Sequence, residues 1–362
     1  MVFSVNNGMF PKITDIVDNP AITTMPGTDG AVPLTREWTG IAALDRQFTV
    51  LLVFFWQLLD GRHPAGTLQA AHFFGQMGAY WTLMQLEAKR EGNKRRIIAT
   101  TLIGLLYQNI SVAITIPLWC LAHLLTLPAR PTSSTLTAAL SIDPVEARIL
   151  PWAMTLGYIL PSVAMAVPPS QYAPNLPAQT QQYLATAWQV FPLWTALSSA
   201  LILRPIFTST TTSTTNPATT KTKPTTTTPP HLFALLLATI PHAATLALSL
   251  TAFLLPTLFH APTSFHPLAV FLPRYSPPDA APVSLAAGVH RFMQWDEAVS
   301  GAASVVWAAT VYLRDARTKG GEGRWGVGGV AARAVGWSVV GGPAAAAVVL
   351  VWGRDEVVFA SL

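Results

Sequence analysis

The stretch HLFALLLATIPHAATLALSLTAFLLPTLF, residues 231–259, is apolar over its whole length and contains no Asp, Glu, Lys or Arg. A helix needs about 20 such residues to cross the ~30 Å hydrocarbon core of a bilayer. A helix is the expected form, because a bilayer offers no water to satisfy unpaired backbone groups. The stretch therefore predicts a membrane-spanning helix.

Other parts of the chain are apolar in the same way: Ile41–Leu59, Thr67–Leu86, Ile97–Leu127, Ile149–Val167, Tyr183–Leu203, Glu297–Leu313 and Val327–Trp352. Charged residues make up 11% of the 362 residues, against about 25% in ordinary soluble domains. The mean hydropathy is +0.40. These features predict an all-α, polytopic transmembrane helix bundle.

Basic residues predict that two connecting loops face the cytosol. The loop after the second stretch has Lys89, Arg90, Lys94, Arg95 and Arg96. The loop after the seventh stretch has Arg314, Arg317, Lys319 and Arg324. Five stretches lie between these loops, and five single crossings would put them on opposite sides. We therefore expect one proline-bearing stretch, within 97–127 or 149–167, to be re-entrant, which gives about seven spans instead of eight.

The chain is predicted to have four parts: a polar N-terminal segment (1–40), an N-terminal bundle half (41–203), a Thr/Pro-rich loop (204–230) and a C-terminal bundle half (231–362). Thr and Pro bury too little apolar area to offset chain entropy, so the loop is expected to be a disordered tether. A glycosylated, mucin-like loop would fit the same composition on the lumenal side. No internal repeat is visible, so an inverted-repeat transporter is not supported.

Several classes of function do not fit the sequence. The net charge of +5 comes mostly from the basic loops, so nucleic acid is not an expected partner. Cys120 is the single cysteine, which excludes an internal disulfide and cysteine-based metal or redox motifs. A P-loop, a G-x-S-x-G elbow, an H-E-x-x-H motif and an Asp-rich diphosphate motif are all absent from the sequence. The polar start predicts no cleavable signal peptide.

A few carboxylates stand among the apolar runs: Asp60, Glu87, Asp296 and Glu297. A carboxylate beside a membrane core is costly and is typical of functional sites. With a cytosolic N-terminus, the first span delivers Asp60 to the lumenal boundary, where the seventh stretch begins with Asp296. These two acids are therefore expected on one face, whereas Glu87 is expected in a separate cytosolic layer.

Polar and aromatic residues are expected to line a cavity beside these acids. His72 and Gln76 share one face of the second helix, and Tyr107, Gln108 and Asn109 lie near the middle of the third. The residues predicted to contact a substrate are His72, Gln76, Trp81, Tyr107, Asn109, Trp56 and Trp295, with Trp307 also close to the acids. Ring faces attract cations, so such a wall would suit a carbocation.

Each candidate also has a structural interpretation. Asp60 followed by Gly61 could simply terminate a helix, and Asp296 could cap the start of one. Glu87 could form an ion pair with Lys89 or Arg90 at the membrane boundary. His72 and Gln76 could hydrogen-bond between helices, as polar residues in membrane bundles do.

Three blocks of sequence carry a resemblance to a known family: LTREWTGIAALDRQFTVLLVFFWQLLDGRHP (34–64), HFFGQMGAYWTLMQLEAKREGN (72–93) and FMQWDEAVSGAASVVWA (292–308). They resemble the membrane-bound terpene cyclases of fungal meroterpenoid pathways, of the kind used for ascochlorin and ascofuranone. Related multi-span proteins occur in indole-diterpene pathways. The resemblance implies residence in the endoplasmic reticulum and a pathway of secondary metabolism.

The resemblance also implies a reaction that needs no cofactor and no metal. Such enzymes protonate a terminal epoxide on a prenyl chain attached to an aromatic ring, and the resulting cation closes the rings. Burial disfavours the charged form of a carboxyl group, so a membrane cavity could keep one protonated. Asp60, Asp296 and Glu87 are the predicted catalytic residues, with Asp60 or Asp296 as the general acid.

The expected partners are a hydrophobic terpenoid substrate, the lipid bilayer and other enzymes of the same pathway. Two other functions stay open from the sequence. The first is a non-catalytic transporter or scaffold of a biosynthetic cluster. The second is an isomerase of the sterol type, which would protonate an alkene instead of an epoxide.

Overall fold

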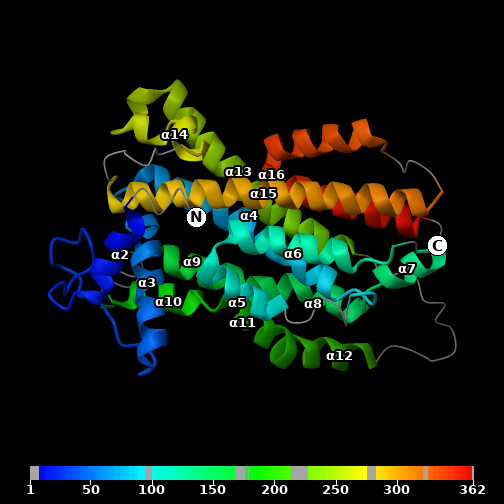
Figure 1. Ribbon diagram of the computed structural model, residues 1–362, viewed down its shortest axis with the longest axis horizontal. Helices are drawn as coiled ribbons and strands as arrows, with labels where there is room; N and C mark the ends of the chain where they lie inside the picture. The colour runs from blue at the N-terminus through cyan, green and yellow to red at the C-terminus, as the bar shows by residue number, and fades with distance from the viewer. Residues whose placement is uncertain are drawn as a thin grey trace. The chain divides into compact units, whose positions relative to one another are not determined.

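The computed structural model of the chain describes residues 8–93, 100–129, 131–167, 176–177, 179–212, 227–274, 283–320 and 325–360 (Figure 1). Regular secondary structure in these residues is helical, and one isolated antiparallel bridge joins Thr24 to Pro33. The predicted all-α fold is therefore confirmed.

The helices of the first half are α2 (Met9–Asp18), α3 (Ala42–Leu59), α4 (Pro64–Ala88), α5 (Thr100–Ile110), α6 (Val112–Thr126), α7 (Ser133–Leu140), α8 (Pro144–Met154), π-helix η1 (Thr155–Ile159), α9 (Leu160–Ala166) and α10 (Thr180–Trp188). Those of the second half are α11 (Phe191–Leu197), π-helix η3 (Ser198–Leu203), α12 (Arg204–Thr212), α13 (Thr228–Leu254), the 3₁₀ turns η4 (Pro256–Leu258) and η5 (Pro262–Phe265), α14 (Pro267–Phe271), α15 (Leu285–Thr318) and α16 (Val327–Phe359).

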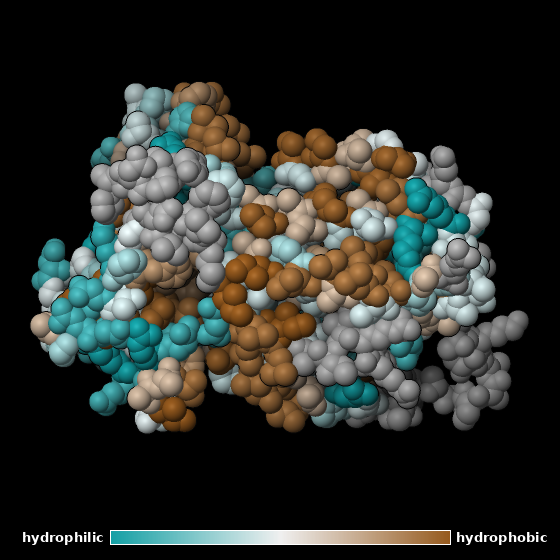
Figure 2. All heavy atoms as spheres, in the orientation of Figure 1, coloured by the Kyte–Doolittle hydropathy of each residue, from teal (hydrophilic) through white to brown (hydrophobic). Residues whose placement is uncertain are grey.

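Five described helical segments are long and apolar enough to cross a membrane: Ala42–Leu59, Pro144–Ala166, Phe191–Thr208, Thr228–Leu254 and Val327–Phe359. They are compatible with an integral membrane protein, and the count of about seven spans stays a prediction. Large apolar side chains are also exposed, as expected of helices that face lipid. On α5 and α6 these include Leu102, Leu106, Leu118, Leu121 and Leu125, and apolar surface covers this region in Figure 2.

The predicted stretch Ile97–Leu127 is two helices instead of one. The break between α5 and α6 lies at Ser111, whose φ of 130° and ψ of 138° are not helical. Its hydroxyl accepts a hydrogen bond from the Ala113 N–H at 3.1 Å and so caps α6. Pro117, the proline of this stretch, lies inside α6. Neither helix has the ~20 residues that a straight crossing needs.

Part of the predicted Thr/Pro-rich loop is helical. Arg204–Thr212 is helix α12, which continues η3 without interruption, and α13 begins at Thr228. Residues 213–226, which include Lys221 and Lys223, lie outside the described residues. Four of the basic residues that predict a cytosolic location, Lys94, Arg95, Arg96 and Arg324, also lie outside the described residues.

The chain forms two compact units that do not coincide with the predicted bundle halves. Unit 1 comprises Met1–Phe73, Leu160–Phe191 and Thr245–Asp296. Unit 2 comprises Phe74–Ile159, Pro192–Ala244 and Glu297–Leu362. In unit 1, α2 and α10 pack against α3; in unit 2, α8 packs against η3 and α12, and α7 packs against α16. Each unit is thus built from segments that are far apart in sequence.

Helix α16 is kinked at Gly342–Pro343, where Gly342 has a positive φ of 83°. Proline has no N–H to donate back to Val339, and His242 Nε2 donates to the Val339 carbonyl instead at 2.9 Å. The Gln76 amide hydrogen-bonds to other backbone groups at and near the kink. Its Nε2 donates to the Gly341 and Ala238 carbonyls, each at 3.1 Å, and its Oε1 accepts from the Ala344 N–H at 2.9 Å.

Replacing Gln76 with Leu is expected to destabilise the kink. The change leaves buried backbone groups of α16 without partners, and each such group costs about 1–3 kcal/mol. The expected result is a lower thermal unfolding midpoint of the detergent-solubilised protein. Gln47→Leu, at a half-buried glutamine of α3, is the matched control, and equal unfolding midpoints for the two variants would contradict this role of Gln76.

Candidate active site

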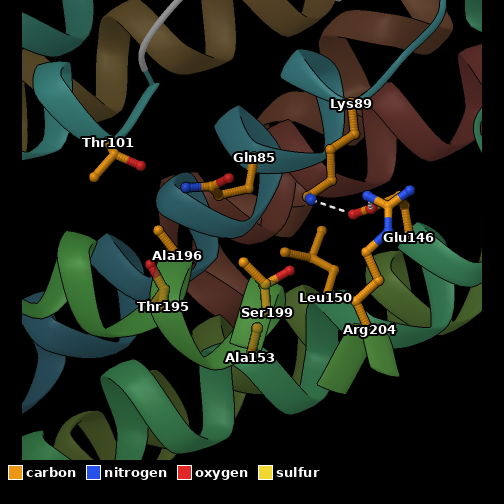
Figure 3. A pocket seen from close by; sticks show the side chains of 11 residues that line it. Gln85, Lys89, Thr101, Glu146, Leu150, Ala153, Thr195, Ala196, Ser199 and Arg204 are labelled. Atoms are coloured by element: carbon orange, nitrogen blue, oxygen red, sulfur yellow. Dashed lines mark hydrogen bonds and ion pairs between the residues drawn. The ribbon is translucent and has the colours of Figure 1, made fainter. Parts of the chain in front are cut away.

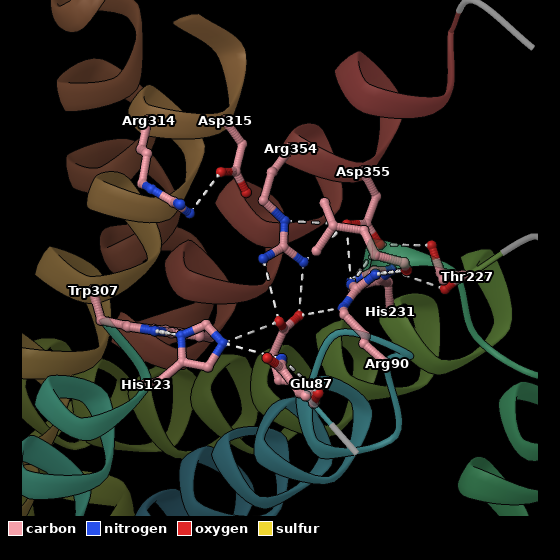
Figure 4. A network of polar contacts seen from close by, with 12 residues as sticks. Glu87, Arg90, His123, Thr227, His231, Trp307, Arg314, Asp315, Arg354 and Asp355 are labelled. Atoms are coloured by element: carbon pink, nitrogen blue, oxygen red, sulfur yellow. Dashed lines mark hydrogen bonds and ion pairs between the residues drawn. The ribbon is translucent and has the colours of Figure 1, made fainter. Parts of the chain in front are cut away.

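Unit 2 holds two polar features on different faces of the end of α4. One is a cavity of about 290 Å³ that Gln85 and Lys89 help to line (Figure 3). The other, which we call the charge cluster, consists of Glu87, Arg90, Arg354 and Asp355 (Figure 4). The charge cluster is the stronger candidate for chemistry, because its carboxylates are removed from water.

In the charge cluster, each carboxylate contacts both guanidinium groups. Glu87 Oε1 accepts from Arg90 Nε and from Arg354 Nη2, both at 2.7 Å. Asp355 accepts from Arg90 Nη2 at 2.7 Å and from Arg354 Nη2 at 2.9 Å. Paired guanidinium groups favour the charged form of a carboxyl group. The resting cluster is therefore a neutral set of four ionised side chains.

The four side chains are almost completely buried, with at most 2% of any residue exposed. Burial of that kind is tolerated only when every charge is paired and hydrogen-bonded. Arg90 also donates to the Leu140 carbonyl at 2.7 Å, and the Thr227 hydroxyl donates to Asp355 Oδ2 at 2.9 Å. These contacts draw α4, α7, α13 and α16 together at one point of unit 2.

The least engaged oxygen of the charge cluster is Oε2 of Glu87. Its guanidinium contact, to Arg354 Nη1, is 3.3 Å long, compared with 2.7 Å for the contacts of Oε1. The imidazole Nε2 of His123 lies 3.5 Å from it. Protonation of this oxygen would disturb the fewest hydrogen bonds.

Trp307 fixes the tautomer of His123. An indole N–H can only donate, and Trp307 Nε1 lies 3.0 Å from His123 Nδ1. Nδ1 must therefore be the bare nitrogen, and the neutral ring carries its proton on Nε2. Nε2 lies 3.5 Å from Glu87 Oε2 and 3.3 Å from Asn93 Nδ2. Trp119 stacks on the face of the imidazole with an interplanar angle of 12°.

An aromatic cavity of about 10 Å³ lies beside this histidine. Its lining residues are Tyr80, Leu83, Met84, Ile116, Trp119, Cys120, Ser304 and Trp307. The Tyr80 hydroxyl and the Trp119 indole N–H have no hydrogen-bond partner among the described residues, although Tyr80 is 3% and Trp119 is 4% exposed. Buried donors without partners are uncommon and call for an explanation.

Among the predicted site residues in unit 2, only Glu87 belongs to the charge cluster. Gln76 holds the kink of α16. Trp81 donates to Thr195 Oγ1 at 3.4 Å and meets Tyr107 edge to face at 5.6 Å. Asn109 is exposed and bonds to the Leu105 carbonyl of its own helix. The predicted cavity wall is therefore divided among separate structural roles.

Unit 1 contains Asp60 and Asp296. Asp60 directly follows α3, and its carboxylate accepts from the Arg62 backbone N–H and from Arg62 Nε, each at 2.9 Å. Gly61, with φ of 72°, turns the chain there, as the helix-terminating interpretation expected. Asp296 is 6% exposed and lies inside α15, which begins at Leu285, so the interpretation as a helix cap is wrong.

The remaining predicted residues of unit 1 pack against loops and α14. His72 meets the Phe271 ring edge to face at 5.2 Å. Trp295 Nε1 donates to the Arg274 carbonyl at 3.3 Å. Trp56 is 5% exposed, and its Nε1 has no hydrogen-bond partner among the described residues.

Unit 1 also contains a histidine pair whose stability is expected to depend on pH. His63 Nε2 lies 3.1 Å from His290 Nδ1, and His290 Nε2 donates to the Val270 carbonyl at 3.1 Å. Burial lowers the pKa of His290 to about 4 and also lowers the pKa of His63. The ordinary pKa of about 6.5 applies to the unfolded chain, so the unfolded chain binds more protons below that pH.

We therefore expect stability to fall as the pH drops from about 6.5 towards 4. The free energy of unfolding should fall by up to about 1.4 kcal/mol per pH unit because of His290 alone. Unfolding midpoints of wild type and His290→Gln, measured at several pH values, check this, because the variant should give the flatter profile. His260→Gln, at an exposed histidine, is the control and should keep the wild-type profile.

Most of the charge cluster and its neighbours was not predicted from the sequence. Arg354 and Asp355 follow the apolar stretch that was ended at Trp352, and His123 was absorbed into another stretch. A search for every charged or imidazole side chain at the ends of apolar stretches would have found them. Their contacts with Glu87 could not be predicted from a single sequence, because Arg354, for example, is 267 positions away from Glu87.

A scan against family models matches the chain to the CtvD domain over residues 1–359. The chain belongs to the CtvD domain family. The predicted resemblance to fungal terpene cyclases is thereby confirmed, and membership supports a cyclase enzyme at the level of the family. Solved structures give no match.

Three relatives of this family illustrate the similarity. The terpene cyclase ascI of Acremonium egyptiacum is 28% identical over 99% of this chain and 88% of its own length. The terpene cyclase ctvD of Aspergillus terreus is 31% identical over 77% of this chain and 74% of its own. The terpene cyclase janA of Penicillium janthinellum is 29% identical over 86% of this chain and 78% of its own length. The CtvD domain thus accounts for nearly the whole chain.

Proposed function

We propose that this member of the CtvD domain family is an integral-membrane terpene cyclase that protonates the epoxide of a prenylated aromatic or related terpenoid. The observation that carries the proposal is that Glu87 of the charge cluster lies next to His123, whose imidazole packs against the rings of Trp119 and Trp307. A buried carboxyl group thus lies close to ring faces that can stabilise a cation.

Glu87 is the proposed proton donor: it first takes up a proton on Oε2 from its ionised resting state, and Oε2 is then the donating atom. The Oε2 proton passes to the epoxide oxygen while the bond from that oxygen to the more substituted carbon breaks. The bond electrons stay on the oxygen, which becomes a hydroxyl, and the carbon becomes a tertiary cation. The guanidinium groups of Arg90 and Arg354 stabilise the carboxylate left behind, which makes protonated Glu87 a strong donor.

The cation then reacts with electrons of the substrate itself. An alkene of the prenyl chain attacks the cationic carbon, forms a ring bond and moves the positive charge along the chain. Ring faces of Trp119 and Trp307 are suited to hold this charge. The cascade ends in one of two ways: a carbon next to the final cation gives its proton to water, or a hydroxyl oxygen of the substrate bonds to the cationic carbon and gives its proton to water. Water at the membrane boundary then returns a proton to the Glu87 carboxylate, so no net proton is consumed.

Asp60 and Asp296 stay in the proposal as alternative acids. The Arg62 contacts of Asp60 support a structural role at the end of α3. Asp296 is buried within α15 and is the stronger alternative. We also propose residence in the endoplasmic reticulum with other enzymes of the pathway, which a fluorescent fusion beside a reticulum marker can test.

The deciding experiment feeds the expressed protein a series of epoxyfarnesyl-aromatic compounds in yeast microsomes. A cyclised product, detected by mass spectrometry and absent from vector-only microsomes, is the expected result. Matched compounds with an alkene in place of the epoxide separate epoxide opening from sterol-type isomerisation. Substrate that accumulates in the protein without conversion, across the series, would instead favour a transporter or scaffold.

A further inference from the structure

The polar cavity of unit 2 in Figure 3 is built from two kinds of lining. Its polar side chains include Gln85 of α4, Lys89 directly after α4, Thr101 of α5, Ser199 of η3, Glu146 of α8 and Arg204 of α12. Its apolar side chains are Leu150, Ala153, Ala196 and Ala200. At about 290 Å³ the cavity is close to the lower end of the range for small-molecule sites. A ligand that matches this lining has a polar head and an apolar tail.

The charges of this cavity favour an anionic head. Lys89 Nζ and Arg204 Nη1 both donate to the Glu146 carboxylate, the second at 2.8 Å. Two cations thus share one carboxylate and leave a formal positive charge. The Arg204 side chain is 57% exposed, and Nη1 is the one guanidinium nitrogen with a described hydrogen bond. Several of its donors therefore face open space, in the fork that suits a phosphate.

The backbone around the cavity is unusual. Ser199 and Ala200 belong to η3, a π-helix, in which the turn is wider than in an α-helix. π-Helical turns are rare and are frequent at functional sites. Because η3 leads directly into α12, the same turn that opens the cavity wall also carries Arg204 to its edge.

The position along the chain indicates the source of the ligand. Arg204 lies near the end of the apolar segment Phe191–Thr208, and Lys89 starts the loop whose basic residues predict a cytosolic location. Anionic phospholipids are concentrated in that leaflet, and basic pockets between membrane helices bind their head groups.

We propose that the polar cavity binds the phosphate head group of an anionic phospholipid, held by Lys89 and Arg204, with Glu146 as an internal competitor for the same cations. The apolar lining takes the start of the acyl region. This site is separate from the charge cluster, and the proposal is independent of the catalytic one.

The test measures thermal unfolding of the full-length protein, followed by tryptophan fluorescence, in phosphatidylcholine nanodiscs with and without phosphatidic acid. Phosphatidic acid is expected to raise the wild-type midpoint by roughly 2–4 °C. Lys89→Gln and Arg204→Gln should lose most of this rise. Arg333→Gln, at a cation that instead stacks on Trp325 at 4.1 Å, is the matched control and should keep it.

Glu146→Gln separates a binding site from a merely structural ion pair. If Glu146 competes with the lipid, this variant has a lower midpoint in phosphatidylcholine but a larger rise with phosphatidic acid than wild type. An equal rise in all four variants, or no larger rise in Glu146→Gln, overturns the proposal. Inorganic phosphate is the final arm: a full rise with phosphate alone would assign the site to a small anion and also overturn it.

Discussion

Cyclisation by the Glu87→Gln variant is expected to be at least about 100-fold slower than by wild type, because a positioned general acid contributes about 10²–10⁴-fold. Glutamine keeps the shape of the side chain and can still accept from a guanidinium group, but its amide cannot donate a proton to an epoxide oxygen. The measurement is cyclised product formed per unit of folded protein, with a fluorescent fusion and size-exclusion profile to quantify the folded fraction.

Two variants make the result specific to the Glu87 carboxyl group. Glu91→Gln removes an exposed carboxylate four residues further along and should leave the rate unchanged. Glu87→Asp keeps an acid in the charge cluster at a shorter reach and should retain part of the activity. Near-normal product formation by Glu87→Gln, together with a large loss in Asp296→Asn, would move the acid to Asp296 and contradict the assignment of Glu87.

The sequence was sufficient for the fold class because the signal is local. A stretch such as residues 231–259 has no alternative to a helix in a membrane, and α13 covers Thr228–Leu254. The break at Ser111 was not predicted, because a serine gives no local signal against a helix. Pro117, which does give such a signal, lies inside α6. Whether a helix contains a proline or ends near it depends on neighbours that can satisfy the freed carbonyls.

The candidate site was predictable only in part, because it depends on contacts between distant segments. Glu87 could be recognised as a carboxylate at the end of an apolar stretch. Its partner Arg354 could not be assigned to it, since the two residues are brought together by the packing of α4 and α16 within unit 2. Gln76 shows the opposite case, because a buried amide that suggested substrate binding is committed to the backbone of a kink.

Removing a cation and an anion of the charge cluster together is expected to destabilise the protein by less than the sum of the two separate removals. Arg354→Met leaves Arg90 as the only guanidinium partner of two buried carboxylates, and an uncompensated buried charge of this kind costs about 3–5 kcal/mol. Glu87→Met leaves the opposite imbalance and should cost a similar amount.

The double variant Glu87→Met/Arg354→Met keeps Arg90 and Asp355, which hydrogen-bond to each other at 2.7 and 3.0 Å. Its charge is balanced, so its loss of stability should be smaller than the sum of the single losses by at least about 2 kcal/mol. Reversible unfolding in mixed micelles gives the three free energies. Additive losses would mean that the four side chains do not act as one electrostatic unit, and the neutral resting state from which Glu87 is proposed to take up its proton would then lose its physical basis.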